Sequence, residues 1–136
     1  MRGRSRRGER AQSLVEFALL APVLIILMLG IIDYGRVYFA YISVTNGART
    51  GADYAATGPT AASDLAGIKN AATAETSELL NTSPTNPNVS AAIGTDGQGR
   101  TYADVTVEYT FTTLFPWPGL PSSIDMERTV RASVAE

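Results

Sequence analysis

The sequence contains no cysteine and no histidine among its 136 residues. Without cysteine the chain forms no disulfide, offers no thiolate nucleophile and builds no zinc–sulfur site. Without histidine it lacks both the usual general base near neutral pH and the commonest protein ligand of metals. Charged residues are also scarce, at 18% of the chain, whereas apolar residues make up 45%. This composition disfavours a hydrolase or a metalloenzyme, and we expect no catalytic residue, metal site, cofactor or small-molecule substrate.

The few charges are unevenly distributed along the chain. Residues 1–13 carry five arginines and one glutamate, a net charge of +4, whereas residues 37–136 carry five basic and ten acidic residues, a net charge of −5. A basic terminus is typical of a solvated arm or of a nucleic-acid contact. Here it directly precedes an apolar run, so we expect a membrane and not a nucleic acid as its partner.

The apolar run extends from Leu14 to Ile32 and contains one charged residue, Glu16. A helix over these 19 residues is about 28 Å long, close to the ~30 Å hydrocarbon thickness of a bilayer. The stretch lacks the polar stripe of a helix that packs on a small soluble core. It therefore predicts a transmembrane helix. By the positive-inside rule, the preceding arginines place the N-terminus in the cytoplasm and the rest of the chain outside.

Two kinds of export signal are less favourable interpretations of the same segment. The apolar run is longer than that of a secretory signal peptide, and no small-x-small cleavage site follows it. Arg6-Arg7 resembles a twin-arginine signal, but Glu9 and Arg10 stand where that signal has apolar residues.

The helical pattern continues beyond the apolar run and ends at Gly58-Pro59. Gly47 and Gly51 each weaken this extension by up to ~1 kcal/mol, which leaves a break near residue 47 open. One face has two interpretations: the core of the domain that follows, or a surface where small residues let neighbouring subunits approach. Its members recur every three or four positions: Tyr34, Tyr38, Tyr41, Thr45, Ala48, Ala52 and Ala55.

The rest of the chain predicts a small head. Residues 60–80 are typical of a weaker helix with Ser63 as N-cap, and residues 81–88 of a loop. The apolar side of this predicted helix holds Leu65, Ile68, Ala72 and Leu79. Alternating residues then predict about three antiparallel strands, near 89–93, 103–112 and 124–134, joined by a hairpin at Asp96-Gly97-Gln98-Gly99 and a proline-rich loop at 116–121.

The strand pattern also predicts how the sheet is covered. The second strand turns one apolar side to the core: Ala103, Val105, Val107, Tyr109 and Phe111. Arg128 interrupts the apolar side of the third strand, which predicts a bulge or an edge position. Because a sheet with one apolar face needs a cover, we expect the helical extension to lie on it. The predicted fold class is α+β: a long N-terminal transmembrane helix with a helical extension, then a short helix and a small antiparallel sheet.

Glu16 is a carboxylate inside the predicted membrane segment, where a charge costs roughly 2.5–3.5 kcal/mol at the centre and less near an end. One interpretation is that it reaches the headgroups from the first helical turn, where the helix dipole stabilises it. The other is a functional role, which its sequence context favours.

Residues 10–22, RAQSLVEFALLAP, and residues 30–36, GIIDYGR, resemble the N-terminal region of TadE-like proteins, pilin-like subunits of bacterial tight-adherence pilus systems. The resemblance continues through residues 45–52, TNGARTGA, and covers the strand-rich remainder only in outline. It implies a pilin-like head and a structural role as a pseudopilin or minor pilin in pilus assembly.

The resemblance also implies processing by a membrane-embedded prepilin peptidase on the cytoplasmic side. The cut would fall between Ala11 and Gln12, and Glu16 would become the fifth residue of the mature chain and serve assembly. One departure is that the family pattern has glycine before the cut. Pro22 lies mid-membrane, where neighbours can accommodate a kink.

These interpretations divide the chain into a basic cytoplasmic leader (1–11), a transmembrane helix (12–33), a helical extension (34–58) and an extracytoplasmic α+β head (59–136). We expect a single-pass protein of the bacterial cytoplasmic membrane or of the pilus, with the prepilin peptidase and other pilin or pseudopilin subunits as partners. The alternative is an unprocessed single-pass protein whose head binds an envelope partner.

The remaining motifs are weak. Asn81-Thr82-Ser83 and Asn88-Val89-Ser90 match the glycosylation sequon, but such short matches are common. Asp96 and Asp104 are typical of a turn and a solvent-facing position and not of calcium ligands. Trp117, set among prolines, has two interpretations: an exposed contact, or a cap on a small core.

Overall fold

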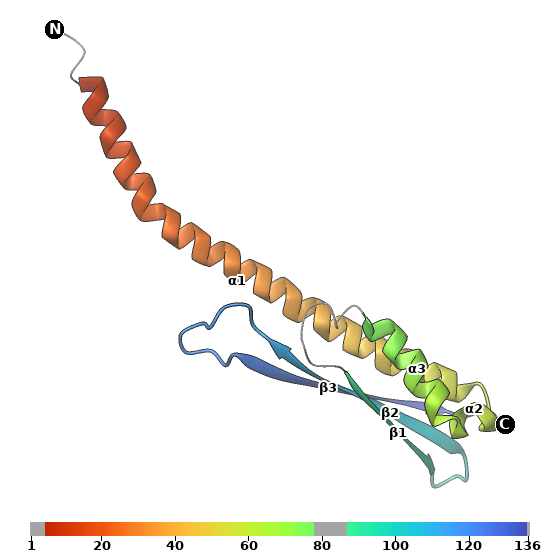
Figure 1. Cartoon of the computed structure of the whole chain (residues 1–136). Coiled ribbons are helices and arrows are strands. Elements are labelled where there is room, and N and C mark those ends of the chain that lie inside the picture. The colour runs from red at the N-terminus through yellow and green to blue at the C-terminus, as the bar shows by residue number, and fades with distance from the viewer. Residues whose placement is uncertain (1–4, 78–86, 136) are drawn as a thin grey trace. The chain divides into compact units, whose positions relative to one another are not determined.

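A computed structural model describes residues 5–77 and 87–135, with side chains from residue 11 onward. Its elements are three helices followed by three strands, as Figure 1 shows: α1 (Ser5–Ala56), α2 (Pro59–Ser63), α3 (Leu65–Thr76), β1 (Asn88–Thr95), β2 (Thr101–Thr112) and β3 (Ser123–Ser133). The predicted α+β class is confirmed. The chain forms two compact units, one ending at Gly35 and the other beginning at Arg36, and each is described by itself.

In the unit that begins at Arg36, α1 contributes a line of small residues to the core. The residues of this line are all 0% exposed: Ala40, Val44, Ala48, Ala52 and Ala55. The core interpretation of the extension is therefore confirmed for its outer half. The same interpretation is wrong for the aromatic residues, since Tyr38 and Tyr41 are 60% and 42% exposed. They follow a different line around the helix from the buried residues.

The break considered near residue 47 does not occur, because α1 continues without interruption to Ala56. The glycines there serve close packing instead of ending the helix. A Cβ added at Gly51 would lie 3.0 Å from the Val105 Cγ1 of β2 and 3.2 Å from the Ala72 Cβ of α3. The helical extension therefore covers the sheet as predicted, with α3 beside it.

The single helix predicted over 60–80 is wrong: the chain forms two helices that divide at Asp64. Asp64, at φ −86° and ψ 79°, leaves helical geometry, and its carboxylate accepts a hydrogen bond from the Gly67 amide at 2.9 Å. Asp64 is thus the N-cap in place of Ser63, which is the last residue of α2. Ile68 is buried as predicted, but Leu65 is 48% exposed. Residues 78–86, including Leu79 and the sequon at Asn81, lie outside the described part of the chain.

The sheet has the order β1-β2-β3 with both pairs antiparallel. The predicted inward residues of β2 are confirmed, for all five are at most 2% exposed. The register of β2 with β3 runs without interruption from Tyr102↔Ser133 to Thr112↔Ser123. Arg128 therefore marks an edge strand and not a bulge, and its guanidinium lies 4.8 Å from the Tyr41 ring centroid.

The predicted hairpin between β1 and β2 is confirmed. Asp96 holds the turn, because its Oδ1 accepts hydrogen bonds from the amides of Gln98 and Arg100, each at 2.9 Å. Gly99 adopts φ +81°, a left-handed conformation that favours glycine.

Candidate functional site: the apolar segment around Glu16

The described part of the unit that ends at Gly35 is a helix on which nearly all large apolar side chains are exposed. Side chains from Leu14 to Ile31 that are 53–73% exposed include Leu14, Phe17, Leu20, Leu24, Leu27 and Ile31. A contiguous apolar surface of this kind marks a contact with lipid or with another protein. It does not belong to the core of this chain.

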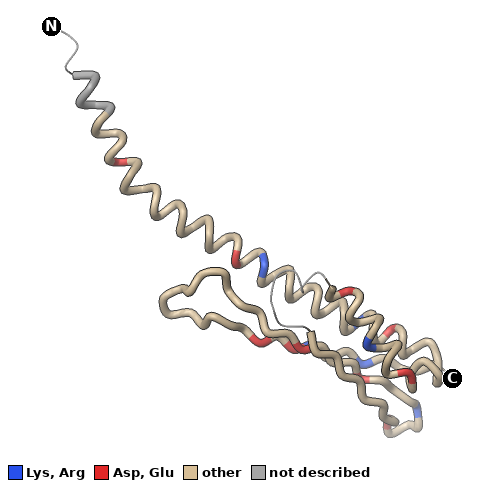
Figure 2. The backbone as a smooth tube through the Cα atoms, in the orientation of Figure 1, with Lys and Arg blue, Asp and Glu red and all other residues tan. Residues whose placement is uncertain are grey.

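This helix is the one among the described residues that is long and apolar enough to cross a membrane. The core helix of a soluble protein passes the same test of length and composition, but such a helix is mostly buried. Here none of the most apolar window is buried. Figure 2 shows the long stretch of α1 without charged residues. The helix is therefore compatible with single-pass membrane anchoring.

Glu16 is the one charged residue within this apolar surface. Its Oε1 accepts a hydrogen bond from the Gln12 Nε2 at 3.2 Å, so residues 12 and 16 share one face of α1. Both residues are exposed, and their neighbours Leu14, Val15 and Phe17 are 61–69% exposed. A carboxylate in this setting needs a proton donor or a cation from its surroundings once lipid replaces water.

The other two predicted positions also lie on α1. Ala11 and Gln12 are exposed and helical, so the predicted cut lies within α1 of the uncut chain. The helix runs on through Pro22, whose ring leaves no amide to bond the preceding turn. The kink at Pro22 and the roles of Ala11, Gln12 and Glu16 stay predictions.

The head offers polar groups that are already paired. Asp96 binds Arg100 with an Oδ2–Nε distance of 2.9 Å, and Asp104 forms a two-point pair with Arg131 at 2.7 and 2.6 Å. These contacts give both aspartates the predicted turn and solvent-facing roles. Within residues 11–77 and 87–135 there is no group of three or more His, Cys, Asp or Glu that could hold a metal ion.

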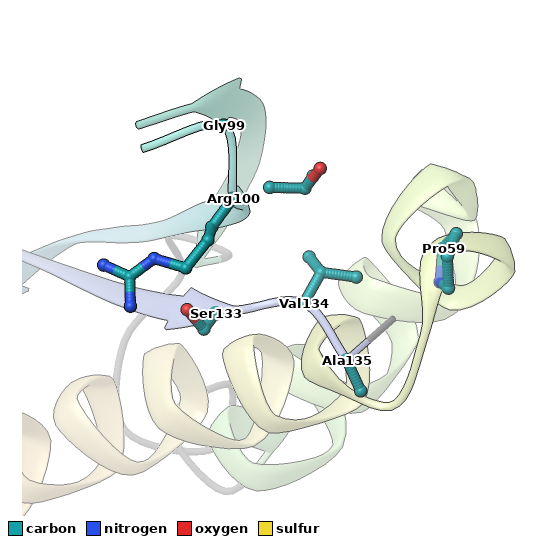
Figure 3. Close-up of a pocket in the computed structure, with 7 residues that line it drawn as sticks. Pro59, Gly99, Arg100, Ser133, Val134 and Ala135 are labelled. Carbon is teal, nitrogen blue, oxygen red and sulfur yellow. The ribbon is translucent and has the colours of Figure 1, made fainter. Parts of the chain in front are cut away.

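A small cavity of about 220 Å³ lies between the β1–β2 turn and the end of β3 (Figure 3). Gly99, Arg100, Val134 and Pro59 are among its lining residues, and Arg100 is the only charged one. The Arg100 guanidinium is already held by Asp96. The cavity therefore contains no pair of a nucleophile and a base, and we do not assign it a catalytic role.

One exposed apolar feature of the head was not identified from the sequence. The loop between β2 and β3 presents Leu114, Phe115 and Leu120, which are 64%, 47% and 65% exposed. Trp117 is half-buried against Phe115, with 5.7 Å between the ring centroids. Trp117 thus packs within its own loop, a position that neither sequence interpretation described. The absence of charge from the loop was the signal available in the sequence.

Comparison with known proteins gives one finding. The family model described as TadE-like protein matches residues 11–53, which include Glu16 and the exposed apolar helix. Searches of curated proteins and of solved structures returned no match to this chain. The match confirms the TadE-like resemblance. It supports an association of the chain with the Tad pilus and with a membrane.

Proposed function

We propose that this TadE-like protein is a pseudopilin or minor pilin with a structural, non-catalytic role in assembling a tight-adherence pilus. It is anchored in the bacterial cytoplasmic membrane by one helix, with the N-terminus in the cytoplasm and the head outside. The family match over residues 11–53 supports the association with the pilus. The exposed apolar surface of α1, with its single carboxylate, is the observation that carries the structural role.

In the proposed role, the exposed apolar surface of α1 makes two successive kinds of contact. In the membrane, lipid covers the apolar side chains between Leu14 and Ile32. In an assembly, the same side chains pack against the helices of neighbouring subunits. The surface suits both environments because it carries no charge between Phe17 and Ile32.

Processing would give Glu16 its partner. A cut between Ala11 and Gln12 removes the five arginines and creates an α-ammonium on Gln12. Because Gln12 and Glu16 share a face of α1, the new cation would lie one turn from the carboxylate of its own chain or opposite that of a neighbour. Losing one partner of such a pair in a low-dielectric setting costs on the order of 3–5 kcal/mol. Glu16 then acts in assembly and not as an acid or a base.

The processing step is tested by the N-terminal sequence of the chain recovered from membranes. With the prepilin peptidase present we expect the sequence to begin at Gln12, and without it at the original N-terminus. Ala11→Gly restores the family's residue before the cut and should be processed at least as fast. An intact Met1 in the wild type, together with a processed Ala11→Gly variant, would show that Ala11 prevents the cut.

One observation favours the alternative of an unprocessed single-pass protein whose head binds an envelope partner. In the uncut chain Glu16 already has a hydrogen-bond partner in the Gln12 side chain. The alternative predicts that Glu16→Ala leaves both localisation and pilus assembly unchanged. The proposed function predicts that Glu16→Ala stays in the membrane but loses its place in the assembly, as measured by crosslinking to other pilus subunits.

A further inference from the structure

The loop between β2 and β3, residues 113–122, is a fixed apolar surface. It contains no charged residue, and none occurs between Glu108 and Asp125. The Thr113 amide donates to the Ser122 carbonyl at 3.0 Å, and the Leu120 amide donates to the Trp117 carbonyl at 3.2 Å. These bonds close the loop on itself, so Leu114, Phe115 and Leu120 are presented to the surroundings by an ordered turn.

The loop leaves the head at the end where α1 enters it. Phe111 is the last inward-facing residue of β2 before the loop, and the Arg36 guanidinium lies 5.0 Å from its ring centroid. Arg36 is the first residue of this unit. The hydrophobic run ends at Ile32, four residues earlier. Chain connectivity alone therefore keeps the Cα atoms of Ile32 and Arg36 within about 14 Å of each other.

We propose that residues 113–122 dock on the surface of the membrane that anchors the chain, with Phe115 and Trp117 in the headgroup layer. This inference depends on the membrane anchoring stated under the proposed function. If the hydrophobic run ends in the membrane, Arg36 lies near the membrane surface, and Phe111 and the loop lie near Arg36. Tryptophan is enriched at this depth, and exposed leucine and phenylalanine gain from partial burial there. The absence of charge removes the main cost of entering the layer.

Docking would give the head a second attachment besides α1. A single transmembrane helix leaves the tilt of the head against the membrane open, whereas two attachments fix which side of the head faces away from the membrane. The polar face of the sheet, with the Asp104–Arg131 pair, is then the side open to other subunits.

Trp117 is the only tryptophan in the chain, so its fluorescence reports on this loop alone. The full-length chain is reconstituted into phosphatidylcholine–phosphatidylglycerol vesicles, with and without bromine on the upper acyl chains. We expect brominated lipid to lower the emission by about twofold and the bilayer to lower quenching by acrylamide severalfold. Emission unaffected by bromine, with full access for acrylamide, would overturn the docking.

Flotation of the same vesicles separates the two claims. If the chain floats with the lipid but shows no bromine quenching, the membrane anchoring is supported and the docking is refuted. If the chain does not float, both are refuted. Protection from acrylamide without bromine quenching, which disappears as the protein is diluted in lipid, would assign the loop to a second copy of the chain and overturn the membrane docking.

Two variants place an acid on an exposed apolar position at opposite ends of the sheet. Leu120→Asp lies in the loop, and the leucine is 65% exposed, so the change leaves the core intact. Ile93→Asp is the matched control, because Ile93 is 47% exposed and lies near the β1–β2 turn. We expect Leu120→Asp to reduce bromine quenching by at least about half and Ile93→Asp to leave it unchanged. Equal effects of both variants would contradict the docking.

Discussion

Gly47 of α1 and Ala72 of α3 lie so close that a Cβ added at position 47 would be 3.0 Å from the Ala72 carbonyl oxygen. The same Cβ would be 2.7 Å from the Thr76 Cγ2. Thr76 is fully buried, and its hydroxyl donates to the Ala72 and Thr73 carbonyls at 3.3 and 3.2 Å. The Thr76 side chain cannot rotate away without breaking those bonds, so an added Cβ would have to push α3 away from α1.

We therefore predict that Gly47→Ala destabilises the head although alanine is the better helix former. The gain of about 1 kcal/mol in helix propensity is smaller than the overpacking cost, and we expect a net loss of about 1–2 kcal/mol. Gly35→Ala is the control, since a Cβ there meets no atom within 4 Å. Urea unfolding of the full-length chain in detergent micelles measures both variants. A Gly47→Ala variant as stable as Gly35→Ala would contradict the close packing.

The Tyr109 hydroxyl is a buried polar atom without a hydrogen-bond partner, on a residue that is 2% exposed. Removing it relieves a desolvation cost, so Tyr109→Phe should stabilise the head by about 1 kcal/mol. Tyr54→Phe should act in the opposite direction, because the Tyr54 hydroxyl donates to the Asp64 Oδ2 at 2.9 Å. The same unfolding experiment tests the pair, and a loss of stability in Tyr109→Phe would refute the assignment.

The head should lose stability in acid. Hydrogen bonds from Arg131 hold the pKa of Asp104 below its ordinary value, and backbone amides do the same for the pKa of Asp64 and Asp96. A carboxylate with a lowered folded-state pKa contributes stability above its unfolded pKa, near 3.8, and loses it as pH falls through the folded value.

We therefore expect the urea concentration at the midpoint of unfolding to fall as the pH drops below about 5. Asp104→Asn removes one of the three aspartates whose pKa is lowered, so the variant should be less stable than the wild type at neutral pH and approach it near pH 3. Parallel stability curves for the two proteins between pH 3 and pH 7 would show that the Asp104–Arg131 pair does not contribute.

The proposed orientation in the membrane can be tested because the natural chain has no cysteine. Gly97→Cys places a thiol in the exposed β1–β2 turn, where a Cβ meets no atom within 4 Å. An impermeant maleimide should label it in intact spheroplasts. Ser5→Cys, expressed without the prepilin peptidase, should be labelled only after permeabilisation. The reverse labelling pattern would invert the orientation.

The elements that could be predicted from sequence are those whose residues carry a strong period. The apolar run, the alternation in β2 and the Asp96–Gly99 turn each follow from neighbouring residues, and the structure confirms them. The division of the 60–80 helix at Asp64 could not be predicted in the same way. Both Ser63 and Asp64 are good N-caps, and only the fold shows that Asp64 also accepts a hydrogen bond from Tyr54, ten residues earlier in the chain.

The exposed tyrosines show a second limit of sequence periods. Tyr38 and Tyr41 fall in register with Ala48 and Ala52, but only the alanines are buried. A period identifies a face of a helix without fixing how the line of contact turns around it, and Ala40, which lies between the two exposed tyrosines, is fully buried. The loop was predicted as a proline-rich segment at 116–121, whereas the exposure of Leu114 and Leu120 could be established only from the fold.

The proposed function depends on lipid surrounding α1 between Leu14 and Ile32. Alkaline carbonate extraction of membranes from cells that express the full-length chain tests it most directly. We expect the chain to stay in the membrane pellet and to float with lipid afterwards. Release of a monomeric, dissolved chain into the carbonate supernatant would contradict it.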